Sequence, residues 1–358
     1  MLHHGLTRIV VTVTAGLTVV ASVAVRPDTV DAAAGNQAHR FVTVMTRNLD
    51  EGTDFGYVVA AAAGQISLSE AVALTYGEVV ASNICGRAAR MADEIAAANP
   101  DLVSIQEAAV WTGPLPAACI GADAPTTIDA GAALLHRLAA DGAKYVVVKQ
   151  QDEFSSSVIA SLLPPGLSFL DRDILLARVE APGQLSLANV TAAHFNTLLP
   201  LQLAPGVTIP ITRGWIAADA TLRGRTVRVI ATHLESFYEP VQQAQGLELA
   251  LGPANTTLPV ILAGDLNTGP GAAQTKTYAF LTTTAGFTDT WTVTHPGDPG
   301  YTDAFYTEDP LTPAVPSERI DLVLLRGNLA PSTDIHVGGE IPHPSDHAGV
   351  VATIRIPS

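Results

Sequence analysis

The sequence predicts an α/β fold in which helices cover β-sheets. Predicted strands and helices alternate along the chain. Most of the strand-like runs are continuously apolar, which is typical of strands buried on both faces and disfavours an open antiparallel sandwich. Of the 358 residues, 47% are hydrophobic, 15% are charged and 2 are cysteine, so a disordered chain and a disulfide-rich scaffold are excluded.

The N-terminal segment has the features of a secretory signal. Arg8 precedes an apolar run over residues 9–25, and residues 31–34 (DAAA) offer small residues for cleavage. The run borders on the length of a membrane span, so a retained anchor is the alternative. We expect a signal peptide over residues 1–34, a secreted protein, and no transmembrane segment in the mature chain.

The first elements of the mature chain are a strand, a helix and a second strand. Residues 41–46 (FVTVMT) are rich in β-forming side chains. Between residues 84 and 95, apolar residues recur at spacings of four, three and four, which predicts a helix with one apolar stripe. Asn99-Pro100 ends this helix, and residues 102–105 (LVSI) follow as a central strand.

Further strands and loops complete a single predicted domain over residues 40–357. Apolar runs predict strands at residues 145–148, 174–177, 227–232, 260–263, 320–325 and 350–354. Stretches rich in Pro and Gly are expected to be long loops rather than domain linkers, because composition does not change across them. These loops cover residues 113–125, 163–166, 200–210 and 295–316.

The two cysteines predict a disulfide, and the net charge bears on the class of substrate. In an exported protein, Cys85 and Cys119 are expected to form a disulfide, which typically contributes about 3–4 kcal/mol. The net charge of −15 disfavours non-specific binding to nucleic acid through the bulk field. A nucleic-acid substrate held by a bound metal ion is still compatible with this charge.

Short polar segments close six of the predicted strands. An apolar strand that ends in Asn, Asp, Glu or His loses stability if these groups are buried without partners. One such segment is typical of a turn, but six of them suggest strand ends that converge on one cleft. The segments are Thr46-Arg47-Asn48, Gln106-Glu107, Thr232-His233-Leu234-Glu235, Gly264-Asp265-Leu266-Asn267, Arg319-Ile320-Asp321 and Ser345-Asp346-His347.

Together, and in this order, these segments resemble the endonuclease/exonuclease/phosphatase superfamily. This group includes secreted deoxyribonuclease I, abasic-site endonucleases, bacterial sphingomyelinases and inositol polyphosphate phosphatases. The resemblance runs from about residue 41 to 355. Residues 49–55 (LDEGTDF), 317–327 (SERIDLVLLRG) and 345–354 (SDHAGVVATI) are similar to an exported bacterial subgroup. The resemblance implies a deoxyribonuclease I-like, four-layer α/β/β/α sandwich of two mixed β-sheets flanked by helices.

The resemblance also implies a divalent metal site. Glu107 is expected to be the principal ligand of Mg²⁺, a hard cation that prefers oxygen ligands and needs few carboxylates from the protein. Asn48 offers a neutral amide oxygen beside it. Asp346 would ligate the metal from the opposite side or through water. Mn²⁺ and Ca²⁺ are the alternatives to Mg²⁺.

Two histidines and their partners match the groups of the family that move protons. His347 resembles the general base that activates water, and Asp321 resembles the carboxylate that orients it. His233 matches a histidine that contacts the phosphate or protonates the leaving group. Asp265 and Asn267 resemble the pair that positions the nucleophile and the phosphoryl oxygens, although in some branches the aspartate is itself described as the base.

Two further residues have roles that the sequence leaves open. Asp173 precedes an apolar strand where the family often has a polar or aromatic residue, but neither tyrosine nor serine occupies the expected place. Arg213, in the sequence Arg213-Gly214-Trp215, is either a phosphate contact or an exposed loop residue that packs on Trp215.

The predicted function is an exported, divalent-metal-dependent phosphodiesterase that binds a phosphate at the metal and activates water with a histidine. Its substrate is either nucleic acid or a phospholipid headgroup, and no stable protein partner is expected. A nuclease normally needs many basic side chains in contact with phosphates, and an inositol-type phosphatase needs a basic pocket. The chain has few lysines, which disfavours both functions. A sphingomyelinase-like enzyme would need an exposed apolar hairpin, for which residues 301–316 are the candidate. A non-catalytic secreted binding module would not require this whole set of residues.

Overall fold

The computed structural model describes residues 41–113, 119, 127–179, 185–204, 206–222, 224–306, 313–339 and 341–356. The predicted signal peptide, residues 1–34, lies outside the described residues, so export remains a prediction. Among the described helices, none is long and apolar enough to cross a membrane.

The first sheet has eight strands and is built around β1 (Phe41–Asn48). This strand pairs in parallel with β2 (Leu102–Gln106) and antiparallel with β16 (Gly349–Arg355). On its other side, β2 pairs antiparallel with β6 (Ser168–Arg178). The remaining strands are β3 (Val110–Thr112), β4 (Thr127–Asp129), β5 (Tyr145–Ser155) and β15 (Ala330–Val337).

The second sheet has six strands in the order β13-β14-β12-β11-β10-β7. At its centre, β11 (Arg225–His233) and β12 (Val260–Asp265) run in parallel, and β14 (Asp321–Arg326) is antiparallel to β12. The register places Asp321 directly opposite Asp265. The remaining strands are β7 (Leu185–His194), β10 (Gly214–Leu222) and β13 (Thr288–Asp289).

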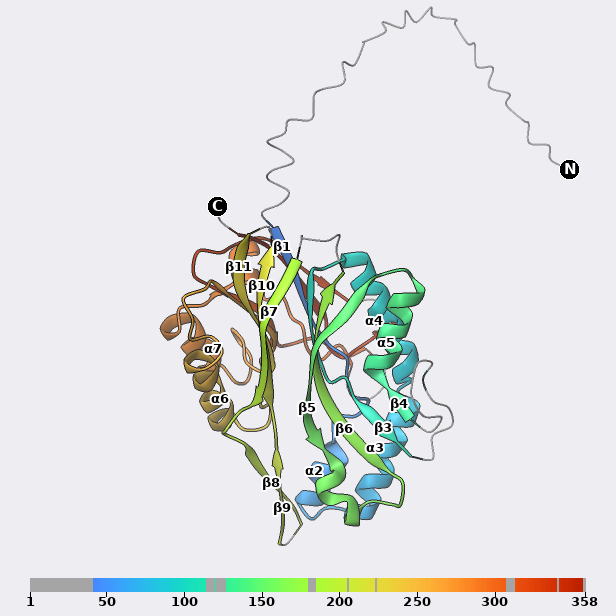
Figure 1. Cartoon of the computed structure of the whole chain (residues 1–358). Helices are drawn as coiled ribbons and strands as arrows, with labels where there is room; N and C mark the ends of the chain where they lie inside the picture. Colours follow the sequence, from blue (N-terminus) through green and yellow to red (C-terminus); the bar gives the residue numbers. More distant parts are fainter. Residues whose placement is uncertain are drawn as a thin grey trace, which may run out of the picture. The chain divides into compact units, whose positions relative to one another are not determined.

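The two sheets pack face to face, with helices on both outer sides (Figure 1). Val44 and Leu102 of the first sheet share one buried cluster with Ile261 of the second. The outer face of the first sheet is covered by α4 (Ile84–Ala98) and α5 (Ala130–Ala140), and that of the second by α6 (Glu239–Leu251). This arrangement confirms the predicted four-layer sandwich of two mixed sheets.

Helix α4 shows why the periodic pattern was informative. Its apolar stripe is buried against the first sheet, because residues spaced three and four apart lie on one face of a helix. The side chain of Asn83 caps its first turn, and Asn99 ends it in a left-handed conformation just before Pro100. Cys85 at its start is disulfide-bonded to Cys119, which confirms the predicted pair.

Two paired strands lie where a loop was predicted at residues 200–210. The strands β8 (Leu199–Ala204) and β9 (Val207–Ile211) make a separate two-stranded sheet, in which Pro200 faces Pro210. Proline cannot donate to a sheet ladder, but in a two-stranded sheet each strand has a free edge that tolerates it. The apolar residues of the hairpin alternate with polar or proline residues, which is the pattern of a strand with one buried face.

Three further elements lie at the same end as this hairpin (Figure 1). They are α2 (Gly56–Ala62), α3 (Leu68–Ala81) and the 3₁₀ segment η2 (Ser156–Leu162). Helix α2 contacts both α3 and strand β8. The remaining short helices are α7 (Lys276–Ala279), η3 (Phe280–Thr284) and α8 (Thr290–Thr294).

Candidate active site

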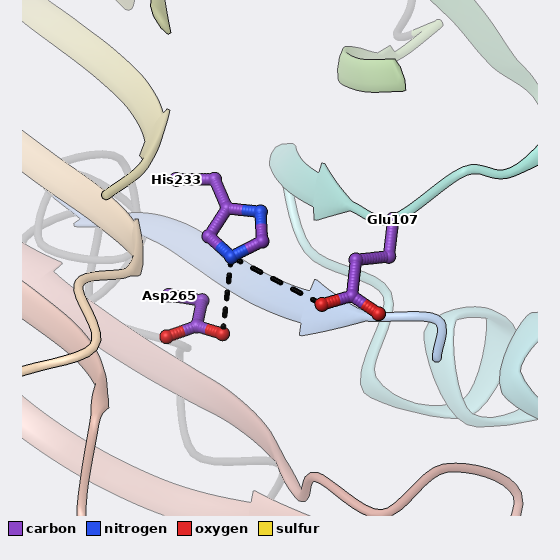
Figure 2. Close-up of side chains that lie close together, drawn as sticks. All are labelled: Glu107, His233 and Asp265. Carbon is purple, nitrogen blue, oxygen red and sulfur yellow. Dashed lines mark ion pairs between the residues drawn. The ribbon is translucent and has the colours of Figure 1, made fainter. Parts of the chain in front are cut away.

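The ends of four central strands bring the predicted polar residues together. Parallel neighbours end at the same edge of a sheet, so β1 and β2 deliver Asn48 and Glu107 side by side. In the second sheet, β11 and β12 deliver His233 and Asp265 in the same way. The two pairs meet across the sandwich, where Asn48 Nδ2 lies 3.1 Å from Asp265 Oδ2. Figure 2 shows His233 between the carboxylates of Asp265 and Glu107.

Glu107 is held by hydrogen bonds to both of its carboxylate oxygens. Asn48 Nδ2 donates to Oε1 at 2.8 Å, and the backbone N–H of Glu51 donates to Oε2 at 3.1 Å. The backbone of Glu107 has φ 55°, an uncommon left-handed conformation that a non-glycine residue adopts only where its surroundings enforce it. Burial raises the pKa of Glu107, and the nearby carboxylates of Asp171 and Asp50 raise it further against the opposing effect of His347.

Asn48 forms hydrogen bonds within the site through both ends of its amide group. Its amide nitrogen donates to both Glu107 and Asp265, and its amide oxygen accepts the backbone N–H of Asp50 at 2.8 Å. The oxygen that was expected to face a metal thus accepts one backbone hydrogen bond, which uses one of its two lone pairs. In this structure Asn48 positions the two carboxylates, since their negative charge attracts its N–H groups.

His347 and Asp321 form the predicted pair. The Nδ1 and Oδ2 atoms are 2.7 Å apart, and both side chains are almost fully buried. This contact leaves Nε2 directed at Asp303 Oδ1, 3.4 Å away, and Asp265 Oδ2, 3.9 Å away. Burial disfavours the charged imidazole, but the carboxylates of Asp321, Asp346 and Asp265 outweigh it and raise the pKa of His347 well above its usual value.

His233 is a neutral histidine whose tautomer can be deduced. Its Nδ1 lies 3.3 Å from Arg213 Nη1, and because a guanidinium only donates, Nδ1 must accept. The ring proton therefore resides on Nε2, which lies 3.6 Å from Asp265 Oδ2 and 4.0 Å from Glu107 Oε1. Burial lowers the pKa of His233 well below its usual value, and the positive charges of Arg213 and His347 lower it further.

Asp265 and Asn267 are fixed by the turn that follows β12. The backbone N–H of Asn267 donates to Asp265 Oδ1 at 2.9 Å, and Asn267 Nδ2 donates to the carbonyl of Leu234 at 2.9 Å. Burial and the neighbouring Asp321 raise the pKa of Asp265 to about 7, although His347 acts in the opposite direction.

The residue types at the site fit a divalent cation. Potential ligand atoms approach one another closely in three groups that share His347 or Asp265 and include the predicted ligands Glu107 and Asp346. Their donors are mainly carboxylate oxygens, which hard cations prefer. Burial raises the pKa of both Glu107 and Asp346, and adjacent carboxylates raise it further, so a bound cation would relieve this repulsion.

All eight predicted site residues are thus gathered at one end of the sandwich. Six of them line a common cavity, and Asn48 and Asp321 touch that set through hydrogen bonds. The six are Glu107, His233, Asp265, Asn267, Asp346 and His347.

The site also contains Arg213, whose role the sequence left open, and three residues that were not predicted. Arg213 is buried and donates to Asp171 Oδ2 at 2.7 Å, so the interpretation as an exposed loop arginine was wrong. Asp171 and Glu51 line the cavity with it. Asp303 faces His347 from a loop. Asp171 precedes Asp173 by two residues, so both lie on the same face of β6. This spacing is the one local signal in the sequence that could have indicated Asp171 as a site residue.

Asp173 is buried next to the site but does not reach the cavity. It is 1% exposed, it does not line the cavity, and neither carboxylate oxygen has a hydrogen-bond partner among the described residues. Burial raises the pKa of Asp173 well above its usual value, and Glu153 and Asp171 raise it further.

Two aromatic residues of the candidate membrane hairpin, Phe305 and Tyr306, contact the site. Tyr306 is 4% exposed, and its hydroxyl donates to Asp50. The backbone N–H of Phe305 donates to the carbonyl of Asp346 at 2.9 Å. Residues 307–312 lie outside the described part of the chain, and Tyr301 and Val315 of the same segment are exposed, so membrane contact stays a prediction.

Comparison with known families decides the class of protein. The sequence model of the endonuclease/exonuclease/phosphatase family matches residues 80–347, about three quarters of the 358 residues. The chain belongs to this family. Its members hydrolyse phosphoester bonds and depend on divalent metal ions, so this family member is a metal-dependent hydrolase of phosphoesters.

Solved structures share the fold of this family member at low sequence identity. The endonuclease/exonuclease/phosphatase from Bacteroides vulgatus is 14% identical with a TM-score of 0.54, covering 88% of this chain and 99% of its own. The human nocturnin catalytic domain with bound sulfate is 17% identical with a TM-score of 0.53, covering 89% and 94%. TDP2 from D. rerio, complexed with single strand DNA product, is 17% identical with a TM-score of 0.52, covering 88% and 99%. No curated protein matches the sequence.

Proposed function

We propose that this family member is a divalent-metal-dependent phosphodiesterase in which His347 activates water. The observation that carries the proposal is the convergence of two buried histidines and several carboxylates on one cavity. Phosphodiester hydrolysis needs an oriented water and compensation of charge on the phosphoryl oxygens.

Glu107 and Asp346 are the residues that would hold the cation, with Mg²⁺ as the proposed ion and Mn²⁺ or Ca²⁺ as alternatives. When bound, the cation would neutralise charge on the phosphoryl oxygens. Asn48 keeps Glu107 in place through its amide N–H.

His347 Nε2 is the atom that accepts the proton of the attacking water. In the neutral ring, Asp321 accepts the hydrogen bond of Nδ1–H, so Nε2 is the acceptor. The neighbouring carboxylates raise the pKa of His347 and favour the charged ring, and a bound cation would offset their charge and favour the neutral one. Asp265 was the alternative base, but Asn267 donates to its Oδ1 and Asn48 to its Oδ2, which together hold the carboxylate in one orientation. This arrangement favours a positioning role for Asp265.

His233 supplies a hydrogen bond to a phosphoryl oxygen. Its Nε2 carries the proton and points toward the metal-binding carboxylates, because Arg213 occupies Nδ1. A neutral donor of this kind suits phosphate contact better than proton transfer to the leaving group, since its pKa lies well below its usual value.

The residues around the cavity favour a substrate with little phosphate charge. Arg213 is the only lysine or arginine among the described residues that line it. An inositol polyphosphate or a nucleic-acid backbone would need several basic contacts. We therefore propose that the substrate is a phosphodiester that carries a single phosphate, the one that reacts.

Bis-p-nitrophenyl phosphate tests this proposal. We expect purified protein to release p-nitrophenol in the presence of Mg²⁺ and to lose at least about 100-fold in rate when EDTA removes the metal, because charge neutralisation at the phosphate is lost. Re-addition of Mg²⁺ should restore the rate. The monoester p-nitrophenyl phosphate is the matched control, and faster hydrolysis of the monoester than of the diester would contradict the proposal.

A further inference from the structure

The catalytic residues occupy only one part of their cavity. The cavity has a volume of about 270 Å³, and His233, Asp265 and His347 lie along one portion of its wall. Most of the remaining wall is apolar. A molecule that fills the cavity must therefore present a phosphoester to one portion and a hydrocarbon surface to the rest.

The apolar wall comes from elements that the catalytic machinery does not use. Helices α2 and α3, the segment η2 and the hairpin β8–β9 all contribute side chains to it. Leu201 and Leu203 come from β8, and Ile209 and Ile211 from β9, so one face of the hairpin lines the cavity. Figure 1 shows α2 and the hairpin at the same end of the sandwich.

Apolar side chains also line this cavity while exposed to solvent. Phe237, which follows β11 shortly after His233, is 60% exposed, and Val59 of α2 is 44% exposed. Single exposed apolar residues scattered over a surface are common and indicate nothing. Exposed apolar residues that line one cavity form a continuous apolar surface, which is typical of a binding site.

Three aromatic residues of the wall pack on one another and do not offer free ring faces to nucleic-acid bases. The rings of Trp111 and Phe169 pack against each other with centroids 4.3 Å apart, and Phe55 packs on Phe169 at 5.4 Å. Trp111 Nε1 donates to the carbonyl of Glu51, so its polar group is also used. Recognition of bases requires free ring faces or polar groups at their edges, whereas a hydrocarbon chain requires neither.

From these observations we propose that the substrate is a phosphodiester bearing one long hydrocarbon chain, which lies in the apolar part of the cavity. This proposal rests on the proposed phosphodiesterase function and adds the class of substrate. The cavity volume is just below the range of about 300–1,000 Å³ typical of small-molecule sites, which favours a single chain over two. Water attacks phosphorus while His347 Nε2 takes its proton, and the bond from phosphorus to the leaving-group oxygen breaks with its electron pair passing to that oxygen. The oxygen then takes a proton from solvent or from His347, and the chain remains on the phosphate or departs with that oxygen.

A series of p-nitrophenyl alkyl phosphodiesters tests the proposal. Methyl, butyl, octyl and dodecyl esters would be assayed with Mg²⁺ below the concentrations at which they aggregate. We expect kcat/KM to rise roughly threefold per added methylene, because each one leaves water for an apolar wall, and to level off when the chain fills the cavity. The octyl ester should exceed the methyl ester at least about 100-fold.

Two variants at neighbouring residues of β8 test whether the dependence of kcat/KM on chain length arises in the apolar part of the cavity. Leu201 lines the cavity and Gln202 is exposed on the other face of the strand. Leu201→Glu should lower the octyl-to-methyl ratio of kcat/KM at least tenfold, since it places a charge against the chain. Gln202→Glu should leave the ratio and both rates within twofold of the wild type. An unchanged ratio in a folded Leu201→Glu protein would overturn the proposal.

A second measurement uses only the wild-type protein, in case the Leu201 variant does not fold. Octylphosphonate should inhibit hydrolysis of bis-p-nitrophenyl phosphate at least about 100-fold more strongly than methylphosphonate. Equal inhibition, or a flat alkyl series with bis-p-nitrophenyl phosphate still hydrolysed, overturns the substrate class and leaves the phosphodiesterase function standing. Failure to hydrolyse every diester overturns both.

Discussion

Replacing His347 with alanine is expected to lower kcat for bis-p-nitrophenyl phosphate by about 10²–10⁴-fold, the usual contribution of a general base. The variant removes the Nε2 atom that accepts the proton of water and leaves Asp321 without its partner. Saturating Mg²⁺ should not restore the rate, because the loss concerns proton transfer. Steady-state kinetics with the wild type and the variant measure this difference.

His136 provides a matched control for this substitution. It is exposed on α5, on the outer face of the first sheet. His136→Ala should retain full activity, and circular dichroism should show that both variants keep the wild-type fold. A folded His347→Ala protein with more than about a tenth of the wild-type kcat would contradict the role of His347 as the base.

Glu107→Gln is expected to raise the Mg²⁺ concentration needed for half-maximal activity by about 100-fold or more. Loss of a residue that only orients a metal ligand already costs about 10–100-fold in affinity, so loss of a charged ligand should cost at least as much. Glutamine keeps an oxygen that can accept the N–H of Asn48, so the local fold should persist. Mg²⁺ titration of activity and calorimetric titration measure the change.

Glu70→Gln is the corresponding control, because Glu70 is an exposed carboxylate in the first turn of α3. It should have the same Mg²⁺ requirement as the wild type. If Glu107→Gln also kept that requirement, Glu107 would not be a ligand and the metal would have to bind elsewhere.

Most of the central strands could be predicted because their side chains are buried on both faces. A continuous apolar run such as residues 260–263 has few alternatives to a central strand, and the three-four spacing of residues 84–95 has few alternatives to a helix. The hairpin at residues 200–210 was missed because its prolines dominated the interpretation. Its alternating apolar residues carried the correct signal.

The site was predictable where polar residues directly follow apolar strands. Glu107, His233 and Asp265 all follow this rule. Arg213 and Asp303 do not, because they reach the site from loops whose positions depend on distant contacts. A family resemblance connected the strand ends, since spacing in the sequence alone gives no distance between elements of different sheets.

The apolar part of the cavity could not be predicted from sequence for the same reason. Its walls come from α2, α3, η2 and the hairpin β8–β9, which are separated by up to 150 residues or so along the chain. Each of these elements has apolar residues that would serve equally well in an ordinary core. Only their arrangement around the catalytic residues gives them a common role.

Anomalous diffraction from crystals grown with Mn²⁺ tests the central claim most directly, namely that these strand ends surround one cation-binding site. We expect an anomalous peak within about 2.5 Å of a carboxylate oxygen of Glu107, inside the cavity that His233 and His347 line. Absence of a peak there, or a peak only at other carboxylates, would contradict it.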